Sequence, residues 1–294
     1  MYRALHRAWD STVTSLTPVD QITLAYIWIT GVYAVVGWER LDYAGAHLAF
    51  RVVLSLLILL IALYRNNNMS RAGRFVTDIY PLLLLGLFYN ETDLLNNVFI
   101  PNLDPWLVSI ENSIFGMQPS IVFSEVFSRS WFNELMFFGY FSYFVLIAGF
   151  LLTEYRKNKE HFRHDVFIIT GSFYIYYLIF CLVPAAGPQF HFAAPESEVP
   201  ATYLFSHLVK FIQAIGERPT GAFPSSHVAM AMIILTLLYR RNRLAFLPAV
   251  VLVVLLIPST IYIKAHYAVD VLGGLLSFPA VYLTNIRLFR HLDQ

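Results

Sequence analysis

Gly221-Ala222-Phe223-Pro224-Ser225-Ser226-His227 and His266-Tyr267-Ala268-Val269-Asp270 are two short polar clusters in the otherwise apolar C-terminal third of a 294-residue chain. Two apolar runs, 228–239 and 244–263, lie between them and are separated by Arg240-Arg241-Asn242-Arg243. If each run crosses a membrane, the chain leaves one face and returns to it. The pattern therefore predicts a helical hairpin that places both histidines and the aspartate at the same depth, beside one membrane surface.

The composition is that of a membrane protein. Hydrophobic residues make up 57% of the chain and charged residues 13%, whereas soluble domains carry about a quarter charged residues. The net charge of +1 gives no indication of a nucleic-acid partner, and none is expected. The one cysteine, Cys181, lies inside an apolar run and excludes an internal disulfide.

Apolar segments of sufficient length predict a polytopic all-α bundle with about eight membrane spans. The predicted spans lie near residues 21–38, 46–64, 75–90, 131–153, 165–184, 224–240, 244–263 and 266–287. We expect residues 1–70 to form an N-terminal two-span extension. Residues 71–294 are expected to form a six-span core that carries both polar clusters.

Basic residues predict the sidedness of the bundle, because they favour the cytoplasmic ends of spans. With the N-terminus inside, 14 of the 20 lysines and arginines fall in inner segments: Arg3, Arg7, Arg65, Arg71, Arg74, Arg156, Lys157, Lys159, Arg163, Arg240, Arg241, Arg243, Arg287 and Arg290. We therefore expect cytoplasmic termini. Both polar clusters are expected on the extracytoplasmic face, which is periplasmic in a bacterium and lumenal in a eukaryote.

Two outer segments, 101–127 and 185–222, are too long to be simple turns. In the first, an apolar stripe at helical spacing predicts a helix lying in the membrane interface; it consists of Leu103, Trp106, Leu107, Ile110 and Ile114. A similar stripe in the second segment consists of Leu204, Leu208, Phe211, Ile212 and Ile215. A loop of this length beside the clusters indicates a lid or substrate-entry element, and a loop that only caps the bundle is the simpler alternative.

Two charged residues inside predicted spans also call for partners. Arg51 and Glu134 lie near the outer ends of their spans. Charges within a membrane tend to pair with one another, so these two are candidates for one pair. We assign them a structural role.

The first polar cluster has the features of an anion site at a helix start. Pro224 suits the first turn of a helix, because its missing N–H is not needed there. Ser225 and Ser226 are able to cap that start, where free N–H groups and the helix dipole attract anions. His227 follows within the first turn, so this pattern suits a phosphate with an imidazole alongside.

The second cluster supplies a histidine and a carboxylate on one helix face. His266 and Asp270 are four residues apart, so the carboxylate is placed to accept a hydrogen bond from one imidazole nitrogen. That bond would leave the other nitrogen as a nucleophile or base. Arg218 and Lys264 flank the clusters on the outer side and are candidates to neutralise a phosphate.

The two clusters resemble the motifs of the type-2 phosphatidic acid phosphatase superfamily. That family carries Pro-Ser-Gly-His and then Ser-Arg-x5-His-x3-Asp. Here the corresponding residues are Pro224-Ser225-Ser226-His227 and Ser259-Thr260-x5-His266-x3-Asp270. The resemblance implies a six-helix core with His266 as the nucleophile that forms a phospho-histidine, Asp270 as its orienting partner and His227 as the acid that protonates the leaving oxygen. It also implies a phosphate-binding role for Ser225, and it implies no metal or other cofactor.

Three positions depart from the family pattern. Ser226 replaces the glycine, and Thr260 replaces the arginine, so Lys264 one turn later is a candidate for the missing charge. The upstream Lys-x6-Arg-Pro element is absent, and Pro184-Ala185-Ala186-Gly187-Pro188-Gln189 stands in its place. Gln189 and Ser226 therefore join Ser225, Arg218 and Lys264 among the candidate substrate-binding residues. The thinner cationic clamp favours a phosphodiester, which carries one charge fewer than an ionised monoester.

Within the superfamily, Gly221-Ala222-Phe223-Pro224-Ser225-x-His227 and the His-Tyr-x-x-Asp motif are similar to inositolphosphorylceramide synthases. That branch implies a lipid phosphotransferase that moves a phospho-headgroup, expected to be phosphoinositol, from a glycerophospholipid to a ceramide-type alcohol. A lipid phosphate phosphatase with the same residues is the alternative. From other classes, a non-catalytic transporter or lipid-binding protein remains open, although no repeated halves are found. A metalloenzyme is a further alternative, since His191 and His207 lie on the same side, but their spacings match no metal-ligand pattern.

Overall fold

The computed structural model describes residues 16–65, 69–196 and 198–294, and its regular elements there are all helices, without strands. Residues 1–15 of the predicted N-terminal extension, with Arg3 and Arg7, lie outside the described residues. The helices are α2 (Pro18–Val36), α3 (Ala44–Tyr64), α4 (Arg71–Leu95), α5 (Asp104–Phe115), α6 (Pro119–Val126), α7 (Ser130–Lys157), α8 (Lys159–Leu182), α9 (Pro188–His191), α10 (Leu204–Gly216), α11 (Ser226–Arg241), α12 (Arg243–Tyr262) and α13 (Ala268–Leu292).

All eight predicted spans are helical. Of the described helices, six are long and apolar enough to cross a membrane: α2, α3, α7, α8, α12 and α13. The chain is an integral membrane protein. The prediction of about eight such spans is corrected at α11 and α4. α11 has 16 residues, and a helix of that length spans only about 24 Å of a core roughly 30 Å thick. α4 has 25 residues, but both of its ends are polar.

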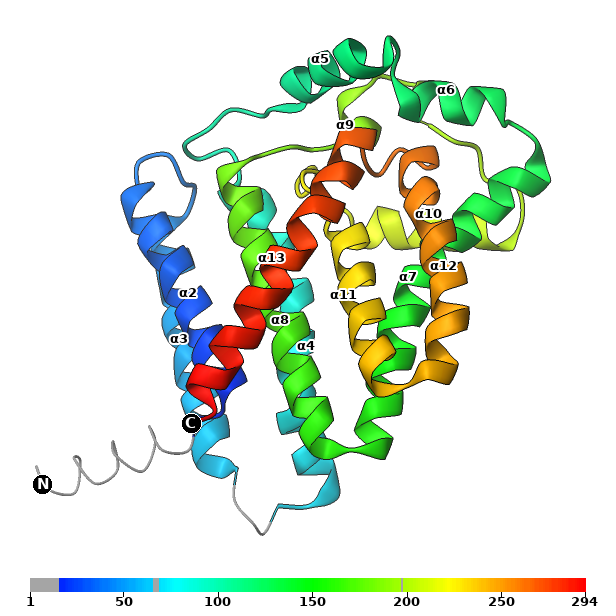
Figure 1. Ribbon diagram of the computed structural model, residues 1–294. Coiled ribbons are helices and arrows are strands. Elements are labelled where there is room, and N and C mark those ends of the chain that lie inside the picture. The colour runs from blue at the N-terminus through cyan, green and yellow to red at the C-terminus, as the bar shows by residue number, and fades with distance from the viewer. Residues whose placement is uncertain (1–15, 66–68, 197) are drawn as a thin grey trace, which may run out of the picture.

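The helices run between two chemically distinct ends of the bundle (Figure 1). The C-terminus and the basic turns α3–α4, α7–α8 and α11–α12 lie at one end, whereas α5, α6 and α9 lie at the other. In the α7–α8 and α11–α12 turns, an asparagine caps the start of the following helix. The Asn158 side chain accepts hydrogen bonds from the N–H groups of Glu160 and His161, and Asn242 accepts one from Ala245.

Helix α11 forms the centre of the bundle. It packs against α7, α8, α12 and α13, and the residues from Val228 to Ala231 are fully buried. Small side chains such as Ala229 and Ala231 let the neighbouring helices approach closely. Because α11 is surrounded, its first turn is fixed relative to α13, and this first turn carries His227.

Helices α2 and α3 pack together, and α2 also packs against α8 and α4. Arg51 on α3 lies 2.7 Å from the Glu91 carboxylate on α4. The predicted pair between Arg51 and Glu134 is therefore wrong. Glu134 instead accepts the N–H of Ser206 at 3.3 Å and that of Phe205, so it caps the start of α10. Helix termini leave free N–H groups that attract a carboxylate more directly than a distant arginine does.

Candidate active site

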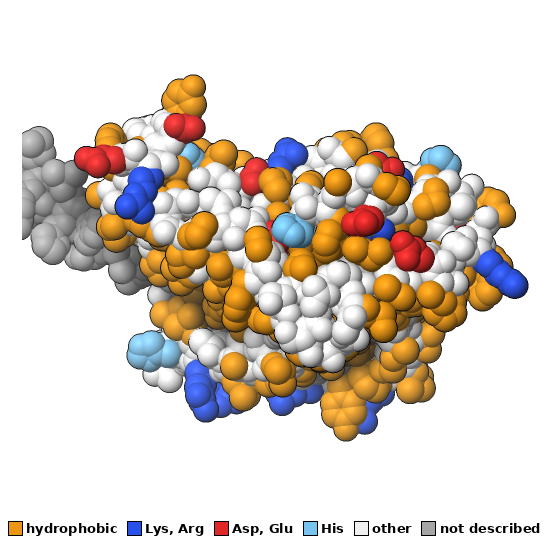
Figure 2. Space-filling view, turned by 90° about the horizontal axis from the view of Figure 1, so that it is seen from above, with side chains coloured by type: hydrophobic (Ala, Val, Ile, Leu, Met, Phe, Trp, Pro, Cys, Tyr) orange, Lys and Arg blue, Asp and Glu red, His pale blue; other side chains and the backbone are white. Residues whose placement is uncertain are grey.

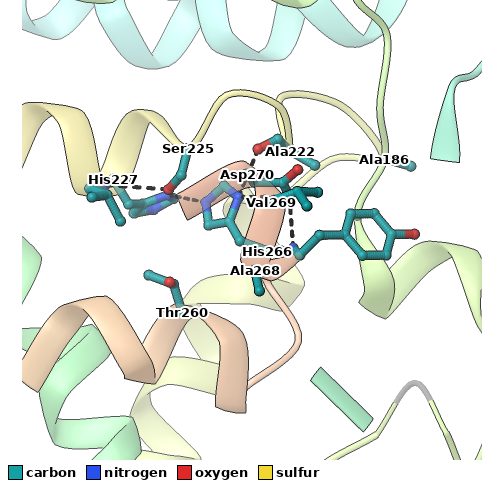
Figure 3. Close-up of polar contacts among 12 residues, drawn as sticks. Ala186, Ala222, Ser225, His227, Thr260, His266, Ala268, Val269 and Asp270 are labelled. Carbon is teal, nitrogen blue, oxygen red and sulfur yellow. Dashed lines mark hydrogen bonds and ion pairs between the residues drawn. The ribbon is translucent and has the colours of Figure 1, made fainter. Parts of the chain in front are cut away.

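The two polar clusters meet at the non-basic end of the bundle. His227 Nδ1 lies 3.0 Å from His266 Nε2 (Figure 3). The backbone holds the clusters in register, because the Ser225 N–H donates to the Asp270 carbonyl oxygen at 2.9 Å. The Ser225 hydroxyl accepts the N–H of Val228 at 3.3 Å and so caps α11, as predicted. The structure thus brings together His227, His266, Asp270 and Ser225.

A glycine on α13 permits this close approach. A methyl group at Gly274 would lie 2.5 Å from the Ser225 carbonyl oxygen, which is far inside van der Waals contact. We expect Gly274→Ala to push the 223–227 segment away from α13 and to lower turnover by roughly tenfold, on the scale of losses from small misplacements of reacting groups. Gly149→Ala on α7, where a methyl group meets nothing within 4 Å, is the matched control. Equal turnover of both variants in the same detergent would contradict this account.

His266 is held by a backbone carbonyl. Its Nδ1 lies 2.8 Å from the Ala222 carbonyl oxygen, and a carbonyl only accepts, so Nδ1 carries the proton. The Asp270 carboxylate lies farther off, with Oδ2 3.6 Å from Nδ1, and accepts the Tyr267 N–H at 2.7 Å. The orienting hydrogen bond predicted for Asp270 is therefore made by Ala222. Asp270 stays close enough to act by charge.

The tautomer leaves the other ring nitrogen of His266 as a base. Burial lowers the pKa of the His266 imidazole to about 4, so the ring is neutral near pH 7. With the proton on Nδ1, the lone pair of Nε2 points at His227 (Figure 3). This is the state that a nucleophilic histidine requires.

The predicted cationic residues point elsewhere. The Lys264 ammonium donates to the Glu196 carbonyl oxygen and lines a pocket of about 230 Å³ that also contains Glu125 and Glu198. Burial lowers the pKa of Lys264, and these carboxylates partly oppose the shift. The Arg218 side chain donates to Asn90 at 3.0 Å. Neither cation contacts the histidine pair in this structure.

The remaining predicted residues differ in their surroundings. Ser226 is the buried first residue of α11. Thr260, at the position of the family arginine, is fully buried and bonds back to the Ile257 carbonyl oxygen at 2.8 Å. The histidines of the metal alternative, His191 and His207, are exposed. Among the described residues, no group of three or more His, Cys, Asp or Glu side chains is placed to hold a metal ion.

A family model described as the PAP2 superfamily matches residues 105–284, more than half of the chain. The chain belongs to this superfamily. The match begins in α5 and includes both polar clusters. Comparison with curated proteins and with solved structures found no match. Members of the PAP2 superfamily are phosphatases and phosphotransferases that process lipids in membranes, so this protein is a membrane enzyme of that general type.

Two carboxylates lie on the buried face of α5 in this PAP2 superfamily enzyme. Asp104 and Glu111 are fully buried, with Leu107 between them on the same face. Asp104 accepts the N–H groups of Ala186 and Gly187 at 2.7 and 2.8 Å. It thus holds the loop that replaces the family's cationic element. Neither acid is among the predicted site residues, although their spacing of seven residues around Leu107 indicates a second buried face.

Glu111 caps the helix that carries Asp270. Its Oε1 accepts the N–H of Ala268 at 2.5 Å and that of Val269 at 3.3 Å. These are free groups in the first turn of α13. Burial raises the pKa of Glu111 to about 7, against the lowering effect of these two hydrogen bonds. Glu111 therefore ionises near pH 7 in the folded protein and near its ordinary value of 4.5 in the unfolded chain.

This raised pKa predicts a pH-dependent stability. The folded protein binds the Glu111 proton more tightly than the unfolded chain, so the stabilisation is complete below pH 4.5 and is lost as the pH rises to 7. We expect the thermal midpoint of wild type to fall relative to that of Glu111→Gln between pH 5 and pH 8. Tryptophan fluorescence during heating in detergent measures both. Parallel pH curves would show that Glu111 titrates normally.

Proposed function

We propose that this enzyme transfers a phospho-headgroup, most simply phosphoinositol, from a glycerophospholipid to a ceramide-type lipid alcohol through a phospho-histidine. The observation that carries the proposal is the opposed pair, His266 Nε2 and His227 Nδ1, 3.0 Å apart. An in-line displacement needs a nucleophile and an acid on opposite sides of phosphorus. This pair meets that need if the two rings separate by several ångströms to admit the phosphoryl group.

In the first step, the lone pair of His266 Nε2 attacks phosphorus. A P–N bond forms while the P–O bond to the diacylglycerol oxygen breaks, and the His227 Nδ1 proton moves to that oxygen. In the second step, the hydroxyl of the acceptor lipid gives its proton back to His227 and its oxygen attacks phosphorus. The P–N bond breaks, and both histidines return to their starting states. Acid–base help of this kind contributes about 10²–10⁴-fold in rate.

The sparse positive charge near the pair favours a phosphodiester over a monoester. Thr260 replaces the family arginine, and Lys264 and Arg218 bond to groups outside the pair. A diester monoanion needs less cationic stabilisation than a monoester dianion. The N–H groups at the start of α11 remain to bind its oxygens.

The surface around the site suits lipids entering from the side. Apolar side chains of α5 and α10 are exposed, with Trp106 57%, Ile114 58% and Phe211 64% accessible. Figure 2 views this end from above and shows hydrophobic side chains spread between scattered charged ones. We place this end on the extracytoplasmic side, with the termini cytoplasmic. Residues 71–294 then form the catalytic core, with 101–127 and 185–222 covering its outer face.

Purified enzyme in detergent, given phosphatidylinositol with ceramide and, separately, phosphatidic acid, tests the proposal. Mass spectrometry identifies the products, and His266→Ala is the control. A ceramide carrying the phospho-headgroup, absent with the variant, would support transfer. Release of free phosphate from phosphatidic acid alone would make the enzyme a phosphatase. No product from any lipid would favour a binding or transport protein.

A further inference from the structure

His227 is connected on its far side to a half-buried carboxylate. Its Nε2 lies 3.1 Å from the Tyr140 hydroxyl, which lies 2.6 Å from Glu217 Oε1. The other carboxylate oxygen, Oε2, accepts the amide N–H groups of Gln189 and, at 3.2 Å, of Gln213. One chain of hydrogen bonds thus runs from His266 through His227 and Tyr140 to Glu217. It joins residues of α7, α10, α11 and the loops beside them.

This chain of hydrogen bonds contains one proton that can occupy either of two places. His266 donates its single ring proton to the Ala222 carbonyl oxygen. The hydrogen bond between His266 Nε2 and His227 Nδ1 therefore needs a proton on Nδ1. If Glu217 is ionised, the Tyr140 hydroxyl donates to it and His227 Nε2 must carry a second proton. If Glu217 is protonated, it donates to Tyr140, which donates to a neutral His227. Both distributions contain the same number of protons.

We propose that Glu217, acting through Tyr140, holds the proton that His227 delivers from Nδ1 to the leaving oxygen. This inference rests on the proposed function. When Nδ1 gives up its proton, the Glu217–Tyr140 pair supplies one to Nε2, and it takes that proton back when Nδ1 is protonated again. His227 can therefore act as acid in the first step and as base in the second. Glu217 and Tyr140 are positioning residues, because they reach the substrate only through His227.

The surroundings of the chain define which other charges act on it. Tyr143 of α7 packs on the His227 ring, with centroids 4.6 Å apart. The Tyr89 hydroxyl of α4 donates to the Thr220 carbonyl oxygen at 3.5 Å, and Arg218 follows Glu217 directly. The Arg218 guanidinium is turned to Asn90 and to the Glu217 carbonyl oxygen. Glu217 is thus the carboxylate that faces His227 through Tyr140.

Substrates with different leaving groups separate this role from a structural one. We expect Glu217→Gln and Tyr140→Phe to lose tenfold to about a hundredfold in turnover of phosphatidylinositol, because its alkoxide must be protonated. On a p-nitrophenyl phosphodiester, whose phenolate leaves without a proton, we expect losses below about threefold in the rate of the first release of p-nitrophenolate. Tyr143→Phe is the matched control, since among the described residues its hydroxyl takes no part in the hydrogen bonds that connect His266 to Glu217.

The pH profile gives a second readout. Glu217→Gln removes the site that holds the mobile proton, so the alkaline limb of the turnover profile should move to lower pH. Equal losses on both substrates, or an unmoved alkaline limb, would overturn the inference. The test concerns the first step, so it holds whether water or a lipid alcohol is the acceptor. A wild-type enzyme without His266-dependent turnover of either substrate would overturn the proposed function itself.

Discussion

Replacing His266 with alanine is expected to abolish turnover, with a loss of about 10⁴–10⁶-fold, as for other nucleophiles of covalent catalysis. The neutral ring presents the lone pair of Nε2, and the Ala222 carbonyl oxygen fixes this tautomer. Within reach of His227 in the described chain, no second neutral imidazole is positioned to replace it. The variant should also fail to form a covalent intermediate.

Rapid-quench experiments with phosphatidylinositol that carries radioactive phosphorus measure both the turnover and the covalent intermediate. Wild type should carry label on the peptide that contains residue 266, and the variant should carry none. His207→Ala removes an exposed histidine of α10 at the same end of the bundle and should keep full activity and labelling. Labelling of His266→Ala at the wild-type level would mean that another residue is the nucleophile.

The hairpin that carries the site could be predicted from the sequence because its signals are local. The pattern consists of two apolar runs, a basic turn between them and a polar cluster at each outer end. It predicts that His227 and His266 lie at the same end of the bundle. A helix of 16 residues, α11, still brings His227 to the end of the bundle where His266 lies. Its packing against α7, α8, α12 and α13 fixes that position.

The partners of His227 and of the start of α13 could not be predicted, because each comes from a distant part of the chain. Tyr140 is 87 residues from His227 along the sequence, and Glu111 is 157 residues from Ala268. In sequence, Tyr140 looks like one more aromatic residue of an apolar span. The orientation of the Lys264 side chain could not be predicted either, because its positive φ of 66° and its contact with Glu196 depend on the folded structure.

The structure also changes the role that Asp270 has to fill, and replacing it with asparagine isolates that role. An amide oxygen at this position can still accept the Tyr267 N–H, so the cap of α13 is kept. The Ala222 carbonyl oxygen continues to hold the His266 tautomer. What disappears is the carboxylate's ability to carry a negative charge 3.6 Å from the ring when that ring becomes positive, as its Nε2 bonds to phosphorus.

Loss of that charge sets the expected size of the effect. Opposite charges about 4 Å apart interact by about 4 kcal/mol at an effective dielectric constant of 20. We therefore expect Asp270→Asn to lose on the order of 10²–10³-fold in turnover, with an unchanged thermal midpoint. Asp270→Ala should lose the same activity and also about 1 kcal/mol of stability, because the cap is gone. If Asp270→Asn instead falls as far as His266→Ala, the carboxylate and not Ala222 orients the nucleophile during the reaction.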